Sequence, residues 1–141
     1  MANGRYQGGR AEQNIIEHFA NVNLDDLKKE DIVSAAKKFS EELSGKNFKI
    51  NQLRKFYNEI MALKNRYNTK KLSDDQLKLD LAIFLSKIEY GKNKAKSGEK
   101  DSFAFYLKNI ETLVNKTNNY NNFKNFVTIM EAIVAYFPKQ N

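Results

Sequence analysis

The sequence predicts an all-α protein folded as a compact bundle of about five to six helices. Apolar residues recur at helical spacing along most of the chain, and no segment shows the alternation of a strand. The single proline, Pro138, lies close to the end, so it interrupts no predicted helix. The chain has 141 residues, of which 41% are hydrophobic, and that length suits one domain with an ordinary core.

We expect three parts along the chain: a flexible basic tail at 1–11, a single helical domain at 12–138 and a C-terminal tail at 139–141. The first part is rich in glycine and arginine and shows no apolar period. A basic glycine-rich tail can bind single-stranded nucleic acid, and the same composition is typical of an unstructured terminus. Both interpretations stay open at this point.

The first half of the domain predicts three helices. A short helix begins at Glu12, with Ile15, Ile16 and Phe19 on one side. A second covers 28–43, because its apolar residues follow the i, i+3, i+4, i+7 spacing and a Ser-Gly pair follows it. A third covers 51–67, with Asn51 as its N-cap.

The second half predicts three more helices. Residues 73–76 (SDDQ) have the form of a capping box and open the fourth helix, which Gly91 weakens near its end. That helix is apolar on two sides, so it is either central in the bundle or shared with another subunit. The fifth starts near Asp101 or Ser102, and the sixth covers 122–137. We expect core or inter-subunit packing from three residues of the last helix: Phe126, Met130 and Val134.

Charge and composition restrict the partners. There are 24 lysines and arginines against 17 acidic residues, a formal net charge of +7, which favours a polyanionic partner such as nucleic acid over an acidic membrane or protein surface. The absence of cysteine excludes disulfides, zinc–thiolate sites, iron–sulfur clusters and cysteine nucleophiles. No apolar run could cross a bilayer and no secretion signal is visible, so we expect a cytoplasmic protein that does not bind membranes.

Catalytic patterns are missing from the sequence. The acidic pairs Asp25-Asp26 and Asp74-Asp75 raise a metal or general-acid hypothesis, but each lies beside a predicted helix start, where the dipole and capping explain it. His18 is the single histidine, and no glycine-rich phosphate loop is present. We therefore expect no enzyme activity, no metal, no cofactor and no small-molecule substrate.

Two basic stretches that also carry aromatic residues are the candidate binding surfaces. On the third helix, Arg54, Lys55 and Arg66 lie opposite the apolar stripe, where they contact phosphate or form a solvated helix face. The second stretch runs from Lys87 to Lys96, and its lysines suit binding to a nucleic-acid backbone whatever the base sequence. Its tyrosine, Tyr90, either stacks on a base or sugar or belongs to the second apolar face.

Three segments resemble, in the same order, motifs of a known family. Residues 49–58 (KINQLRKFYN) are similar to its I-x-x-S/T-Q-[IL]-R-K-F-[FY]-N helix, residues 85–92 (LSKIEYGK) resemble its L-x-P-K-L-A-Y-A-A-G-R stretch, and residues 131–137 (EAIVAYF) resemble its closing E-A-I-V-A-Y-[FH]. The family is the small subunit of the type III-A CRISPR–Cas effector, the Csm complex. The second motif departs from the family's pattern at Ser86, Ile88, Glu89 and Lys92.

The resemblance implies a compact helical bundle whose copies stack inside a ribonucleoprotein that acts in antiviral defense. The copies would lie along the guide (CRISPR) RNA and its paired target RNA and contact the sugar–phosphate backbone of the RNA. Further partners would be other copies of the chain. The backbone subunit and the large subunit of the Csm complex would also be partners, and these two would carry out the catalysis. By position, Gln52, Arg54 and Lys55 match the first motif, and Lys87, Tyr90 and Lys92 match the second.

The sequence therefore predicts a non-catalytic, RNA-binding small subunit of a type III-A complex. The predicted RNA-binding residues are Gln52, Arg54, Lys55, Arg66, Lys87, Tyr90, Lys92 and Lys94. The alternative is a helical adaptor that binds an acidic protein partner without nucleic acid, and nuclease treatment would not disturb such an interaction. A stand-alone DNA-binding protein is disfavoured, because no helix-turn-helix is visible.

Overall fold

The structure is a computed structural model that describes residues 14–139, and these residues form helices and no strand. A π-helical segment leads directly into the first of five α-helices. The elements are η1 (Asp31–Ala36), α2 (Lys37–Gly45), α3 (Ile50–Lys70), α4 (Asp74–Lys94), α5 (Lys100–Asn115) and α6 (Tyr120–Tyr136). The prediction of an all-α bundle is confirmed. The predicted N-terminal tail lies outside the described residues, as do the last two residues of the predicted C-terminal tail.

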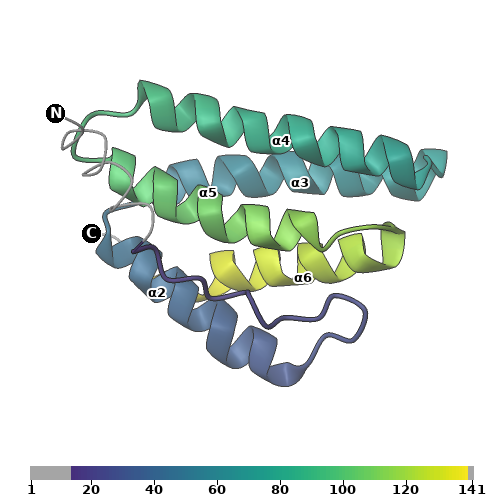
Figure 1. Cartoon of the computed structure of the whole chain (residues 1–141), viewed down its shortest axis with the longest axis horizontal. Coiled ribbons are helices and arrows are strands. Elements are labelled where there is room, and N and C mark those ends of the chain that lie inside the picture. The colour runs from purple at the N-terminus through teal and green to yellow at the C-terminus, as the bar shows by residue number, and fades with distance from the viewer. Residues whose placement is uncertain (1–13, 140–141) are drawn as a thin grey trace, which may run out of the picture.

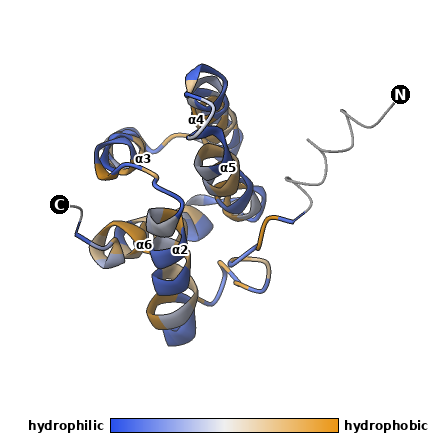
Figure 2. Cartoon of the chain, turned by 90° about the vertical axis from the view of Figure 1, so that its left-hand side faces the viewer, coloured by the Kyte–Doolittle hydropathy of each residue, from blue (hydrophilic) through white to orange (hydrophobic). Residues whose placement is uncertain are grey.

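The four longer helices, α3 to α6, lie side by side, and α2 crosses them at one side (Figure 1, and seen from one end in Figure 2). Their packing is uneven: α4 packs chiefly on α5, whereas α3 packs chiefly on α6. Consequently α3 and α4, although consecutive in the chain, touch one another less closely than they touch those neighbours. No helix in the described part of the chain has the length and apolarity that membrane crossing requires.

Aromatic rings fill the centre of the bundle. Tyr106 of α5 is fully buried and stacks on Phe48 and Phe56, with ring centroids 4.9 Å and 5.5 Å away. The Tyr106 hydroxyl has no hydrogen-bond partner among the described residues. In α6, Phe126 and Met130 lie in the core and Val134 packs partly buried against it, which agrees with the packing role predicted for all three.

Side chains cap the starts of α4 and α6, whereas the start of α3 has no side-chain cap. Ser73 caps α4, because its Oγ accepts a hydrogen bond from the Gln76 N–H at 3.1 Å, as the capping-box pattern predicts. The N-cap prediction for Asn51 was wrong: α3 begins one residue earlier, after Lys49, which makes no side-chain cap. The last helix begins at Tyr120 rather than Asn122, since the Asn119 side chain accepts a hydrogen bond from the Asn122 N–H at 2.9 Å.

Gly91 does not end α4, which continues to Lys94. A Cβ atom at position 91 would lie 2.9 Å from Cε1 of Phe103 on α5, closer than carbon atoms normally approach. The glycine therefore allows the Phe103 ring to pack against the α4 backbone, at a point where α4 and α5 are in contact.

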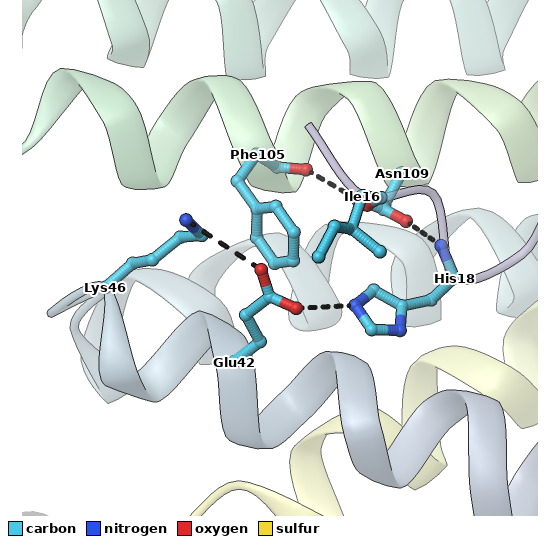
Figure 3. Close-up of polar contacts among 6 residues, drawn as sticks. All are labelled: Ile16, His18, Glu42, Lys46, Phe105 and Asn109. Carbon is cyan, nitrogen blue, oxygen red and sulfur yellow. Dashed lines mark hydrogen bonds and ion pairs between the residues drawn. The ribbon is translucent and has the colours of Figure 1, made fainter. Parts of the chain in front are cut away.

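The prediction of a helix beginning at Glu12 was wrong for the residues that the structure describes, because residues 14–27 form turns and irregular chain. We call this segment the N-terminal strap. One side chain of α5 bonds to two of its backbone groups: the Asn109 amide accepts from the His18 N–H at 2.7 Å and donates to the Ile16 carbonyl at 3.0 Å (Figure 3). Because a side chain from a distant helix supplies these hydrogen bonds, the strap needs no helical hydrogen bonds of its own here.

Lys116 fastens the next part of the strap. Its ammonium group donates to the carbonyls of Phe19, Ala20 and Val22, at 2.9, 2.6 and 2.7 Å. Phe19 is fully buried, so the strap closes one side of the aromatic core. The lone histidine packs within this region, where the His18 ring contacts Glu42 at 2.9 Å (Figure 3).

Candidate nucleic-acid interface

A groove runs along the seam between α3 and α4, where the first turns of α3 lie beside the last turns of α4. We call it the α3–α4 groove, and its volume is about 760 Å³. It exists because α3 and α4 pack mainly on other helices and leave space between them. The buried rings of Phe48, Phe56 and Phe103 form part of its lining. The polar and charged lining residues used below are Lys49, Gln52, Lys55, Glu59, Lys87, Tyr90, Lys94 and Glu99.

The groove gathers five of the eight residues predicted to bind RNA: Gln52, Lys55, Lys87, Tyr90 and Lys94. These residues come from both basic stretches, so the antiparallel pairing of α3 with α4 brings the two predicted surfaces together. Arg66 lines a smaller hollow of about 250 Å³ farther along the same seam. Arg54 and Lys92 line neither of these two hollows.

The charge of the groove is positive on balance. Four lysines, including Lys49, which the predicted site omitted, face two glutamates. Lys49, Lys55 and Lys94 are exposed and so can approach a phosphate without losing much hydration. Lysines in this setting act as point charges, which attract a phosphate backbone without reading the bases.

Tyr90 lies at the surface of the groove, with 63% of the residue exposed. Leu79 and Ile83 on the same side of α4 are also exposed, so the second apolar face of this helix is not buried in the core of the bundle. A core position for Tyr90 is therefore excluded, whereas contact of this face with another subunit stays a prediction. The Lys94 ammonium lies 5.2 Å from the centre of the Tyr90 ring, within the range of a cation–π contact. An exposed ring beside a lysine is suited to stacking on a sugar or base whose phosphate the lysine contacts.

Three of the predicted phosphate ligands are held in ion pairs. Lys87 of α4 contacts Glu59 of α3, with 2.6 Å between Nζ and Oε1. Arg66 contacts Asp80 at 2.6 Å. Lys92 contacts Glu89 on its own helix at 3.0 Å.

Asp80 is the centre of a polar network that joins α3 to α4. The residue is only 8% exposed, and its carboxylate accepts hydrogen bonds from Tyr67 at 2.9 Å and Gln76 at 3.1 Å in addition to Arg66. Burial and the contact with Asp80 raise the pKa of Tyr67 well above its usual value, so the phenol remains a hydrogen-bond donor. Arg66 therefore helps to set the position of α3 against α4, and with it the shape of the groove.

The acidic residues raised as catalytic candidates have structural partners or positions. Asp25 accepts a hydrogen bond from Asn122 at 2.6 Å, and Asp74 and Asp75 occupy the first turn of α4, where the helix dipole favours them. Within residues 14–139, no three His, Asp or Glu side chains gather closely enough to hold a metal ion.

The fold and the groove define the class: a small all-α protein with a lysine-lined groove between two of its helices. The chain matches the family model described as Csm2 Type III-A over residues 26–140, which is most of its length. It therefore belongs to the Csm2 Type III-A family, the small subunits of the type III-A CRISPR Csm complex. The other subunits of that complex are its partners. No curated protein and no solved structure gave a significant match.

Proposed function

We propose that this chain is a non-catalytic RNA-binding subunit whose α3–α4 groove contacts the backbone of the guide RNA–target RNA duplex. The observation that carries the proposal is that the two basic stretches line the same groove. Residues of two motifs more than thirty positions apart in the sequence line one groove, in which four lysines surround Gln52 and the exposed Tyr90. The proposal fits membership in the Csm2 family, whose place is within a ribonucleoprotein.

The chemistry of the groove favours contact with phosphates over recognition of bases. Lys49, Lys55 and Lys94 supply flexible point charges, and Gln52 adds an amide that can donate to a phosphate or a ribose hydroxyl. A few contacts of this kind are weak in one copy. Copies aligned along one duplex would act together, because binding by the first places the next at high effective concentration.

The proposed subunit acts in the cytoplasm, in antiviral defense, and leaves cleavage of nucleic acid to other subunits. The groove is lined by lysine, glutamate, amide and aromatic side chains, and the single histidine, His18, is packed against α2 on the strap side. The groove therefore offers positive charge and a stacking surface, which position RNA.

Purification from the native host tests the assignment. The chain would be tagged and purified gently, and the accompanying RNA and proteins would be identified before and after nuclease treatment. We expect short RNAs that share one repeat-derived end, together with larger Csm subunits. A protein free of RNA, or partners limited to an acidic protein and retained after nuclease treatment, would instead favour the adaptor.

Substitution of groove lysines tests the surface itself. Lys55→Met with Lys94→Met should weaken RNA binding equally for all base sequences and should reduce the salt dependence of log K by nearly one unit for each lost contact. Arg54→Ala, on the outer face of α3, tests whether the RNA extends beyond the groove. Lys108→Met, on the exposed side of α5, is the control and should leave binding unchanged. Unchanged binding in the double variant would contradict the proposal.

A further inference from the structure

We propose that Glu59 is an internal competitor for RNA phosphate and sets the affinity of the α3–α4 groove by occupying Lys87. This inference rests on the proposed function. The Glu59 carboxylate reaches across the seam from α3, and its Oε1 lies 2.6 Å from Nζ of Lys87 on α4. The Glu59 side chain is 28% exposed and that of Lys87 is 55% exposed, so an incoming phosphate can reach the pair.

The position of the pair makes it unavoidable for a strand that follows the seam. Glu59 and Lys87 line both the large hollow and the smaller one that contains Arg66, so the pair spans the seam where the two hollows meet. A polyanion extending from Lys55 toward Arg66 must pass over it. There the RNA meets a negative charge and a lysine that already has an anionic partner.

The pair contributes little to holding the helices together. Ion pairs with this degree of exposure add little to stability, because water screens them and the side chains lose freedom. The less exposed Asp80, with its hydrogen bonds from Arg66, Tyr67 and Gln76, already joins α3 to α4 in the same region. Loss of the Glu59–Lys87 pair should therefore change RNA affinity more than it changes stability.

The proposal predicts an effect opposite in sign to that of the lysine substitutions. Glu59→Gln keeps the size of the side chain, removes one negative charge and releases Lys87 to contact phosphate. RNA affinity should rise, on the order of threefold to tenfold for each copy. The salt dependence of log K should steepen by nearly one unit, since one more counterion is released.

Coupling between the two residues distinguishes release of Lys87 from a general change in charge. In the unmodified protein Lys87→Met should weaken RNA binding, because it leaves the Glu59 carboxylate as an unpaired negative charge in the groove. In the Glu59→Gln background Lys87→Met should cancel the gain. Glu99→Gln is the matched control, because it removes the same charge from the same groove. Glu99 lies at the start of α5 and is not a member of the Glu59–Lys87 pair.

The experiment uses the reconstituted type III-A complex with every copy of the chain carrying the variant, a guide RNA and a labelled complementary target RNA. Target RNA dissociation is measured over a series of salt concentrations, and thermal unfolding of each full-length variant verifies its fold. Tighter binding by Glu59→Gln, reversed by Lys87→Met and larger than that of Glu99→Gln, supports the proposal. Unchanged or weaker binding overturns it, as does an equal gain from Glu99→Gln. Lys55→Met distinguishes a failure of this proposal from a failure of the proposed function. If Lys55→Met weakens RNA binding while Glu59→Gln leaves it unchanged, the groove binds RNA and only the role of Glu59 is overturned.

Discussion

Arg66 and Asp80 form an ion pair across the α3–α4 seam, with 2.6 Å between Nη2 and Oδ2, and the same carboxylate oxygen accepts the Tyr67 hydroxyl at 2.9 Å. An arginine that the sequence assigns to the RNA surface is thus also part of the network that positions α3 against α4. The α3–α4 groove and the polar network share this seam, so a change in the network should alter the shape of the groove.

Asp80→Ala tests the network. The substitution leaves the Arg66 guanidinium and the Tyr67 hydroxyl without their shared acceptor, so the free energy of unfolding should fall by about 2–4 kcal/mol. Urea denaturation monitored by circular dichroism measures the change. Asp75→Ala, at an exposed position in the first turn of α4, is the control and should cost less than about 1 kcal/mol. Equal losses in both variants would show that Asp80 has no special role.

Lys116→Met tests the attachment of the N-terminal strap. Burial lowers the pKa of Lys116 below its usual value, and the ammonium donates to the carbonyls of Phe19, Ala20 and Val22. Removing these hydrogen bonds should cost about 2 kcal/mol and should increase amide hydrogen exchange in the strap before the helices are affected. Lys108→Met, at an exposed position of α5, is the control. Unchanged exchange in residues 14–27 would contradict the attachment.

Two tyrosine-to-phenylalanine substitutions should have opposite effects on stability. Tyr106→Phe removes a buried hydroxyl that has no partner among the described residues, so the protein should be unchanged or more stable by up to about 1 kcal/mol. Tyr67→Phe removes a donor to Asp80 and should cost about 1–2 kcal/mol. Chemical denaturation of the two variants side by side measures the difference. A loss of stability in Tyr106→Phe as large as that in Tyr67→Phe would show that the Tyr106 hydroxyl is satisfied in solution.

Gly91→Ala tests the close packing of α4 on α5. An added Cβ would lie 2.9 Å from the Phe103 ring, and the resulting shift should outweigh the gain in helix propensity, for a net loss of about 1 kcal/mol. Gly45→Ala, where nothing lies within 4 Å of an added Cβ, should be neutral or stabilising. Thermal unfolding of the two variants decides the matter, and a gain from both would mean that the Phe103 ring moves aside freely.

Most of the bundle was predictable because its signals are local. The period of the apolar residues in α3 to α6 and the capping box at Ser73 are properties of neighbouring residues, and the structure places these helices within a few residues of their predicted bounds. The strap was not predictable, since its backbone groups bond to Asn109 and Lys116, more than 90 positions away in the chain. The spacing of Ile16 and Phe19 is that of one helix face, yet the strap is not helical. Phe19 enters the core, whereas Ile16 remains exposed.

The candidate site was predictable in its residue types and less so in its geometry. Charge and motif spacing point to both basic stretches, but the pairing of α3 with α4 decides which cations meet. Arg54 lies beside Lys55 in sequence yet is turned about 100° around the helix, so it does not line the groove. The anionic partners Glu59 and Asp80 belong to different helices from Lys87 and Arg66, and no local pattern marks them as partners.

Photo-crosslinking in the assembled complex tests the central claim most directly. A photoreactive amino acid would replace Lys55 in the groove or, in a separate protein, Lys108 on the exposed face of α5. Both complexes would be loaded with guide RNA and target RNA, and RNA-linked peptides would be identified by mass spectrometry. The account predicts crosslinks to RNA from position 55 and none from position 108. Crosslinks from position 108 with none from position 55 would contradict it, because the RNA would then lie against a different face of the bundle.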